Sequence, residues 1–366
     1  MVSHALSKTN PSKTNPSDWL GLDVAKQAFK AALGRAGQKW PATALRDLPV
    51  REFERSREGL AALMAWLETL LPESSDAYNV RVVMESTGKY SAELAVWMYE
   101  DYPHFRPAIV NPQQTNAYIK SMNVRQQTDA MEARALAFYG LEREPDAYEP
   151  LRPEQAQLRE LTRHRSSLVD QKQALLNRQG EGTPNKFVAK AQDRLCRTFE
   201  REITKVEKEM RALIRDDKQF KHDLKLLTSI YGVAFLTAAS ILAELGNLRR
   251  FVRSRELTAF AGLTPRRKQS GSSVNKPAHL CKKGNGRVRK ALYMAALTAV
   301  NDNGPMQATY VSLCARGKQK KVALGAVMRK LLVLMRAIVI SGQTYDRQWK
   351  HRGKLHTTAQ KNEETP

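Results

Sequence analysis

Two acidic residues stand where buried strands are expected, and both have the chemistry of a metal ligand. Asp23 interrupts the apolar run at residues 19–25, and Glu85 directly follows the apolar run at residues 80–84. An ionised carboxylate in such a strand costs on the order of several kcal/mol unless an opposite charge compensates it. A metal ion would supply that charge, and residues 86–88 end the second strand at a loop edge, where ligands commonly bind.

A second acidic pair, Asp129 and Glu132, is predicted to lie on one helix. The two residues are three positions apart in a segment rich in Ala and Leu, so both carboxylates fall on one helix face. Four carboxylates from two strands and one helix can converge on Mg²⁺ or Mn²⁺, which prefer oxygen ligands and polarise phosphodiesters. Taken singly, a strand-end acid is also typical of a cap or a salt bridge, and a helical Asp-x-x-Glu pair is also typical of a solvated face.

Ser270 is the candidate nucleophile. It follows an apolar segment that ends at Pro265, and it lies in a predicted basic, serine-rich loop with Arg266, Arg267 and Lys268. These three cations would hold a phosphate beside the hydroxyl, as a serine that attacks phosphorus requires. General-base help would come from the acidic residues or from water. The alternative is a flexible turn in which the serine hydroxyls only cap the backbone.

A glycine-rich basic loop at residues 282–286 leads into a predicted helix that runs to about residue 300, an arrangement that suits backbone phosphates. The predicted phosphate-binding residues of both loops are Arg266, Arg267, Lys268, Lys282, Lys283, Arg287, Arg289 and Lys290. The chain of 366 residues has 60 Lys and Arg against 37 Asp and Glu, a net charge of +23. Nucleic acid is therefore the expected partner. The simpler alternative is a soluble protein that is basic without binding nucleic acid.

The elements that must position the acids form an alternating α/β pattern. The predicted elements are strands at residues 19–25, 29–33 and 43–48, a helix with the buried stripe Phe53, Leu60, Leu63, Leu67 and Leu70, a strand at 80–84, a helix at 92–99, a strand at 108–110 and a helix at 128–139. Three strands followed by helix, strand, helix, strand and helix predict a ribonuclease-H-like α/β domain of about 145 residues.

After residue 153 helical signals replace strand signals. Leucines at positions 158, 161, 168 and 175 are heptad-like, and a cleaner apolar seam runs through residues 199–213. Residues 180–185 break the helix, which predicts an antiparallel hairpin or coiled coil that packs within the chain or against another copy. Residues 226–234 and 237–246 resemble a helix-hairpin-helix, whose turn either offers N–H groups to phosphate or only packs helices. A last helix is predicted at about residues 322–340.

These patterns divide the chain into five parts. They are a disordered arm at residues 1–18, an α/β domain at 19–150, a coiled-coil hairpin at 151–222, a mostly helical domain with the serine loop at 223–345 and a polar tail at 346–366. The three cysteines show neither a disulfide framework nor zinc-ligand spacing, which fits a reducing cytosol. The longest apolar run, at residues 331–340, contains Arg336 and is far shorter than the roughly 20 residues of a membrane span. We therefore expect no membrane role.

Four motifs, in order along the chain, resemble those of the DEDD transposases, the IS-one-ten (IS110) insertion-sequence family, which includes pilin-gene invertases. The motifs are Gly21-Leu-Asp-Val-Ala-Lys26, Met84-Glu-Ser-Thr-Gly88, Thr128-Asp-Ala-Met-Glu-Ala-Arg134 and Phe260-Ala-Gly-Leu-Thr-Pro-Arg-Arg, the last followed by Ser270-Gly-Ser-Ser273. The resemblance extends over about residues 19–342. It implies a RuvC-like N-terminal domain, a coiled-coil insertion and a C-terminal transposase domain.

By that resemblance, Asp23, Glu85 and Asp129 take the first three places of an acidic, metal-binding tetrad, and Ser270 is the nucleophile. Glu132 stands where the family usually has Asp. Its extra methylene moves the carboxylate, which is still expected to bind metal. Some family members use a structured RNA, made from the element's own ends, that pairs with donor and target DNA. The positive charge of this chain is compatible with RNA as well as DNA, because phosphate contacts do not distinguish the two.

The expected function is DNA strand cleavage and exchange by an insertion-sequence transposase that depends on Mg²⁺ or Mn²⁺. One alternative is a RuvC-like nuclease in which metal-activated water, not Ser270, is the nucleophile. Another is a non-catalytic nucleic-acid-binding protein, against which Asp23 in an apolar strand argues. Expected partners are DNA, a guide RNA and further copies of the chain, as at least a dimer and up to a tetramer. A prokaryotic cytoplasm, at the nucleoid, is the expected location.

Overall fold

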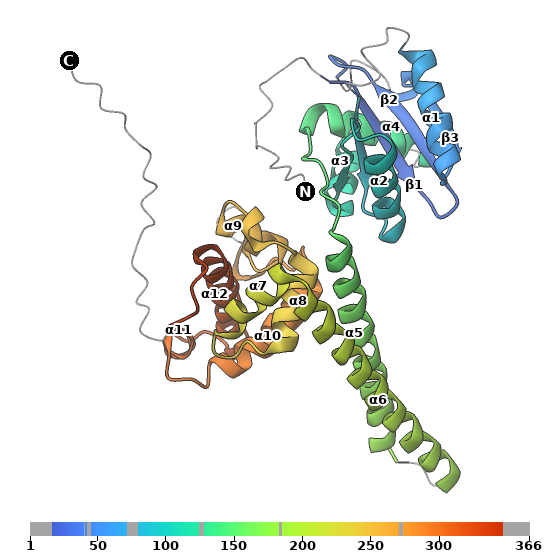
Figure 1. The fold of residues 1–366 in the computed structure, drawn as a ribbon. Coiled ribbons are helices and arrows are strands. Elements are labelled where there is room, and N and C mark those ends of the chain that lie inside the picture. The colour runs from blue at the N-terminus through green and yellow to red at the C-terminus, as the bar shows by residue number, and fades with distance from the viewer. Residues whose placement is uncertain are drawn as a thin grey trace, which may run out of the picture. The chain divides into compact units, whose positions relative to one another are not determined.

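The computed structural model describes residues 17–39, 41, 45–71, 80–123, 128–182, 185–270 and 274–346, with the backbone alone at residues 267–270 and 274–279. Within those ranges no helix is long and apolar enough to cross a membrane. The chain divides into two compact units, residues 1–150 and residues 151–366 (Figure 1). Nearly all of the predicted arm at residues 1–18 and of the tail at 346–366 lies outside the described residues.

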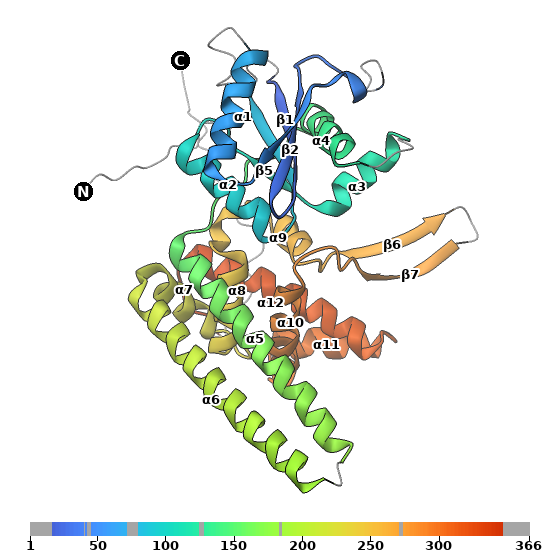
Figure 2. The same ribbon diagram turned by 90° about the vertical axis from the view of Figure 1, so that its right-hand side faces the viewer.

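The first unit is built on a mixed five-stranded sheet with the strand order β3-β2-β1-β4-β5 (Figures 1 and 2). The strands are β1 (Trp19–Val24), β2 (Ala28–Gly34), β3 (Val50–Glu54), β4 (Arg81–Glu85) and β5 (Ala108–Val110). β2 pairs antiparallel with β1 and β3, whereas β4 pairs parallel with β1 and β5. The mixed α/β character of this unit is confirmed, with one helix, at residues 112–121, beyond those predicted, and β1 lies inside the sheet.

Helices cover both faces of this sheet. They are α1 (Arg57–Leu70), α2 (Lys89–Asp101), α3 (Pro112–Ser121) and α4 (Asp129–Arg143). The side chains of Ser56, Asn111 and Thr128 accept hydrogen bonds from the first turns of α1, α3 and α4, which fixes where these helices begin. Leu20 and Leu22 of β1 share a buried cluster with α1 and α2, so these two helices lie on one face.

α4 lies on the other face, close to β1, because glycines leave room for it. A Cβ atom at Gly21 would lie 2.2 Å from the Ala133 carbonyl oxygen, and a Cβ atom at Gly140 would lie 2.5 Å from the Trp19 ring. Trp19, Gly21 and Asp23 alternate along this face of β1. Since Trp19 meets the C-terminal part of α4 and Gly21 meets its middle, Asp23 lies toward the N-terminal end of the helix.

The third strand was predicted at residues 43–48, and this prediction is wrong. A 3-10 helix (Leu45–Asp47) lies there, and the strand is β3 at Val50–Glu54. Phe53, predicted to begin the buried helix stripe, belongs to β3 and stacks on Phe29 with ring centroids 5.6 Å apart. The apolar periodicity continues from β3 into the following helix because both elements bury side chains in the same cluster.

Among the described residues, the second unit is helical except for one β-hairpin. Its long helices α5 (Pro153–Gly180) and α6 (Lys186–Asp216) form the predicted helical hairpin (Figure 1). The other helices are α7 (Lys218–Thr228), α8 (Phe235–Leu245), α9 (Ser254–Phe260), α10 (Gly286–Ala299), α11 (Pro305–Ala315) and α12 (Lys320–Ser341). Leu158 of α5 and Met210 and Ile214 of α6 share one core with these helices. The base of the hairpin therefore packs within its own chain.

The turn between α7 and α8, which resembles a helix-hairpin-helix in sequence, contacts another helix. Gly232 in this turn has φ +87°, and a Cβ atom there would lie 2.7 Å from the Ala295 carbonyl oxygen of α10. This close approach supports helix packing as the reason for the glycine.

The segment that contains Ser270 was predicted as a loop, and this prediction is wrong. It forms an antiparallel hairpin of β6 (Pro265–Ser270) and β7 (Val274–Leu280) (Figure 2). Alternation of apolar and polar residues marks a half-buried strand, and β6 reads Pro-Arg-Arg-Lys-Gln-Ser without such alternation. Ser270 ends β6 opposite Val274, but its side chain and residues 271–273 lie outside the described part of the chain.

Candidate active site

The four predicted acidic residues lie on the elements that the sequence analysis assigned to them. Asp23 is in β1 and Glu85 ends β4. Asp129 and Glu132 lie in the first turn of α4. One face of the sheet and one helix end therefore supply all four carboxylates.

Strand pairing explains why these carboxylates meet. β1 and β4 pair in parallel with Leu22 opposite Met84. The next residues, Asp23 and Glu85, are therefore neighbours on adjacent strands and share a face. Gly21 belongs to the same face, and its close contact with α4 brings the first turn of that helix beside Asp23.

The electrostatics of the site shows that the four carboxylates influence one another. The pKa of Asp23, which is half-buried, is raised from 3.8 to about 6. Burial is the largest cause, followed by the negative charges of Glu132, Asp129 and Glu85. Burial also raises the pKa of Glu132, and the charges of Glu85 and Asp129 add to this effect. The acids form one cluster with an excess of negative charge.

Two residues that the sequence analysis missed bind carboxylates of this cluster. Lys30 of β2 donates a hydrogen bond from Nζ to Asp129 Oδ2 at 2.9 Å, which lowers the pKa of Asp129. Thr115 of α3 is buried and donates from Oγ1 to Glu85 Oε2 at 2.6 Å. A lysine within an otherwise apolar strand was a signal for the first contact. The second contact was missed because helix α3, which carries Thr115, was not predicted.

The cluster has the donor chemistry of a divalent-metal site. Mg²⁺ and Mn²⁺ take oxygen ligands such as carboxylates. Burial, and then the neighbouring negative charges, raise the pKa of Asp23, an effect that a bound cation would oppose. Within the described ranges, no group of three or more His, Cys, Asp and Glu residues stands ready to hold a metal ion. Asp129 is paired with Lys30 instead. The residues therefore fit a metal by the chemistry of their oxygen donors.

The predicted phosphate-binding residues are mostly exposed. The side chains that the structure shows as exposed are those of Arg266, Lys282, Lys283, Arg287 and Lys290. Those of Arg267 and Lys268 lie outside the described side chains. Arg289 is half-buried and donates from Nη1 to the carbonyl oxygens of Ala261 and Gly284, at 3.0 and 2.9 Å. Arg289 thus shapes the basic loop, while its exposed neighbours present positive charge to solvent.

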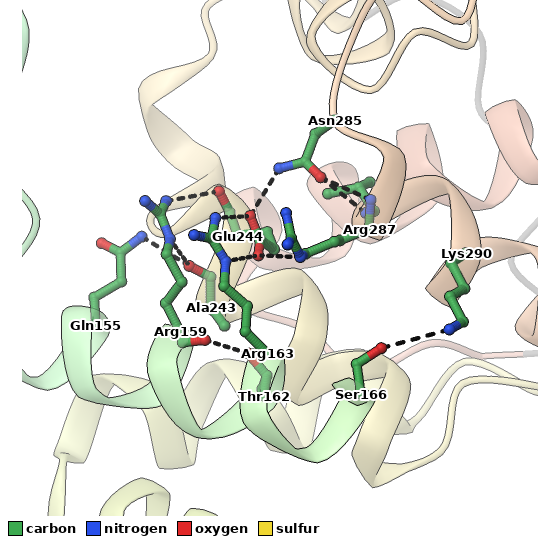
Figure 3. Close-up of polar contacts among 11 residues, drawn as sticks. Gln155, Arg159, Thr162, Arg163, Ser166, Ala243, Glu244, Asn285, Arg287 and Lys290 are labelled. Atoms are coloured by element: carbon green, nitrogen blue, oxygen red, sulfur yellow. Dashed lines mark hydrogen bonds and ion pairs between the residues drawn. The ribbon is translucent and has the colours of Figure 1, made fainter. Parts of the chain in front are cut away.

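A buried carboxylate that the sequence analysis missed holds this basic loop in place (Figure 3). Glu244 of α8 is only 2% exposed and accepts hydrogen bonds from the Arg163 guanidinium group at 2.8 and 3.0 Å. Asn285, which caps α10, donates from Nδ2 to Glu244 Oε2 at 2.8 Å. Burial opposes ionisation, yet the bonds from Arg163 and Asn285 hold the pKa of Glu244 below its ordinary value. Glu244 therefore ties α5, α8 and the start of α10 together.

The chain matches two family models. Residues 20–180 match the DEDD model of IS110 elements, described as Transposase. Residues 224–311 match a model described as Transposase IS116/IS110/IS902 family. The first match contains the four carboxylates, and the second contains Ser270 and both basic loops.

Two similar proteins match over most of the chain, and a third matches over part of it. The pilin gene-inverting proteins of Moraxella bovis and Moraxella lacunata are 28% and 27% identical to it over 331 residues, which are 90% of this chain and 98% of theirs. The transposase for insertion sequence element IS1111A of Coxiella burnetii is 31% identical over 144 residues, 38% of each chain.

Proposed function

This chain belongs to the IS110 family of transposases, and we propose that it cleaves and exchanges DNA strands at a divalent-metal site formed by Asp23, Glu85, Asp129 and Glu132. The observation that carries the proposal is the convergence of these carboxylates on one sheet face. Burial and mutual repulsion there raise the pKa of Asp23 to about 6. Four carboxylates with Lys30 as their neighbouring cation leave net negative charge at the site, which favours a bound cation.

The surroundings of each acid support a distinct part in holding the metal. The negative charges of Glu132, Asp129 and Glu85 all raise the pKa of Asp23. We therefore assign Asp23 as the central ligand. Glu85 is oriented by the hydroxyl of Thr115, and Asp129 is the most accessible, with its side chain 69% exposed. Glu132 supplies the fourth carboxylate on a longer side chain. Bound Mg²⁺ or Mn²⁺ would polarise a phosphodiester and offset the charge that develops on it.

We assign Ser270 the role of nucleophile. Its hydroxyl oxygen forms a bond to a DNA phosphorus while the bond from that phosphorus to the bridging oxygen of the cut strand breaks. The serine proton passes, through a carboxylate or water, to that leaving oxygen. Rejoining reverses the step with the hydroxyl of a new strand. The position of Ser270 at the end of β6, with the exposed cation Arg266 on the same strand, supports this role.

The topology of the first unit supports its assignment to the ribonuclease-H-like class, in a RuvC-like form. Its first three strands form an antiparallel meander, and the next two add in parallel beside β1. The acids lie at β1, β4 and the last helix, so the sheet and the covering helix both contribute.

Nucleic acid and further copies of the chain are the proposed partners. The family implies DNA binding, and the net charge of +23 is compatible with a structured guide RNA as well. α6 exposes Phe187 and Leu195, which are 73% and 52% exposed and which a contact between copies would cover. In a dimer or tetramer, the carboxylates of one protomer would act with Ser270 of another.

Covalent trapping tests this function. The full chain is incubated with Mg²⁺ and DNA that carries the element's own ends, and the products are examined under denaturing conditions for protein attached to DNA. Ser270→Ala should lose both attachment and cleavage, whereas Ser272→Ala, in the same segment, should keep both. Asp23→Ala and Glu85→Ala should lose cleavage and keep DNA binding.

Each part of the proposal has its own contrary outcome. Cleavage by Ser270→Ala without a covalent product would make metal-activated water the nucleophile, as in a RuvC-like nuclease. Normal cleavage by Asp23→Ala or Glu85→Ala would refute the metal site. Sequencing the RNA that co-purifies with the chain tests whether a guide RNA is bound. An active preparation that contains no RNA would exclude a guide RNA.

A further inference from the structure

Lys30 stands directly opposite Asp23 in the sheet. The register of β1 and β2 pairs Asp23 with Lys30, and the register of β2 and β3 pairs Lys30 with Glu52. Residues that face each other across antiparallel strands have Cβ atoms about 4.5–5.5 Å apart and project from one face. The strand pairing itself therefore places an ammonium group beside the carboxylate cluster.

The ammonium group of Lys30 forms ion pairs with Asp129 of that cluster and with Glu52. Lys30 Nζ lies 2.9 Å from Asp129 Oδ2 and 3.4 Å from Glu52 Oε2. Burial is the largest cause of the raised pKa of Asp23, and Lys30 is the neighbour that acts against it. The hydrogen bond from Lys30 is also the largest cause of the lowered pKa of Asp129. Lys30 therefore already acts as a counter-cation for these acids.

We propose that Lys30 competes with the divalent metal for Asp129 and so weakens metal binding in the free protein. This inference rests on the proposed metal site. A metal ion that binds Asp129 must displace the Lys30 ammonium group, or else the repulsion between the two cations weakens its binding.

The expected size of the effect is modest because water reaches the ion pair. The side chain of Asp129 is 69% exposed and that of Lys30 is 28% exposed. An ion pair with a largely exposed partner changes an equilibrium by a small factor, so removing the ammonium group should tighten metal binding about three- to tenfold. Lys30→Arg keeps a competing cation and should leave the affinity close to that of the wild type.

A titration with Mn²⁺ alone, without nucleic acid, tests the competition independently of activity. Electron paramagnetic resonance of the free ion gives the dissociation constant for the full chain. Lys30→Gln should bind Mn²⁺ about three- to tenfold more tightly than the wild type. Lys26→Gln removes an exposed cation next to β1 and should bind like the wild type. Adding Asp129→Asn to Lys30→Gln should abolish the gain.

The outcomes separate this inference from the proposed function. If Lys30→Gln binds no more tightly than the wild type while Asp23→Asn loses binding, the metal site stands and the competition is refuted. If none of these chains binds Mn²⁺, both are refuted. An equal gain in Lys26→Gln would trace the effect to net charge and refute the contact with Asp129. Circular dichroism checks the fold of every variant, and Lys30→Met, which keeps most of the alkyl chain, replaces Lys30→Gln if that variant does not fold.

Discussion

Replacing Arg163 with Met should destabilise the second unit by about 3 kcal/mol at neutral pH, because the Glu244 carboxylate stays buried without its main partner. Removing one partner of a buried ion pair costs roughly 3–5 kcal/mol. The lower end applies because the Arg163 side chain is 42% exposed and Asn285 still donates one hydrogen bond to Glu244. With an m value on the order of 3 kcal/mol/M in urea, the midpoint of unfolding should fall by about 1 M.

Two probes distinguish the units in this experiment. Four of the five tryptophans, at positions 19, 40, 66 and 97, belong to the first unit, so their fluorescence follows its unfolding. Far-UV circular dichroism is dominated by the long helices of the second unit. The Arg163→Met variant should lower the midpoint seen by circular dichroism. Lys205→Met removes a cation from the exposed pair with Glu202 in the same helical hairpin and should cost less than about 0.5 kcal/mol.

The pH dependence gives an independent check. Because the folded protein lowers the pKa of Glu244, its ionised form stabilises the fold fully above the ordinary value of 4.5 and less as the pH falls through the lowered value. The difference between the wild type and Arg163→Met should therefore be largest at neutral pH and narrow in acid. A second variant, Arg163→Met with Glu244→Leu, should recover much of the loss, since no charge stays buried. A cost no larger than that of Lys205→Met, or an unrecovered double variant, would refute the reasoning.

The remaining predictions concern the first unit and the shared site. Gly21→Ala should lower its free energy of unfolding by about 3 kcal/mol, measured by tryptophan fluorescence in urea, because the new methyl group would lie 2.2 Å from the Ala133 carbonyl oxygen. Asp23→Asn should stabilise the metal-free protein by about 1–3 kcal/mol above pH 6, since a pKa raised to about 6 means that ionised Asp23 opposes folding there. That gain should fade as the pH falls toward 3.8, and a gain independent of pH would contradict the stated cause. Glu132→Asp should retain strand cleavage, and complete loss would mean that the site requires the longer side chain. Asp23→Ala and Ser270→Ala chains, each inactive alone, should recover partial cleavage when mixed, and co-assembly without recovery would show that each protomer builds its own site.

The carboxylates could be located from the sequence because local patterns place them. Asp23 and Glu85 belong to apolar runs that predict buried strands in any context, and the spacing of Asp129 and Glu132 predicts a shared helix face. Their convergence was an inference from the order of strands and helices. The close contact of Gly21 with α4, which brings the helix to the sheet, is visible only in the fold.

The contacts that hold the carboxylates could not be predicted, because they join residues far apart in the chain. Lys30 and Asp129 are 99 residues apart, and Arg163 and Glu244 are 81 residues apart. No local periodicity relates such positions. The β6–β7 hairpin could not be predicted either. Backbone hydrogen bonds join its two polar strands, and these strands lack the alternation of apolar and polar residues that indicates a strand.

One helix was missed for a different reason. Asn111 and Pro112 directly follow strand β5, and no helix was predicted after that strand. The same two residues are the N-cap and the first residue of α3, positions that suit Asn and Pro. Asn-Pro after a strand can mark both the end of that strand and the start of a helix. Because the helix was not predicted, Thr115 was not among the predicted site residues.

The position of β1 has a consequence for protein synthesis. This strand precedes the other strands of the sheet in the sequence, yet it lies between β2 and β4, and its Asp23 lies beside the helix that runs from Asp129 to Arg143. Contacts of such long sequence separation form late in folding. A chain that ends before α4 has only two of the four acids, and the sheet face that α4 covers stays exposed. A translation product truncated before α4 therefore cannot assemble the four-carboxylate cluster.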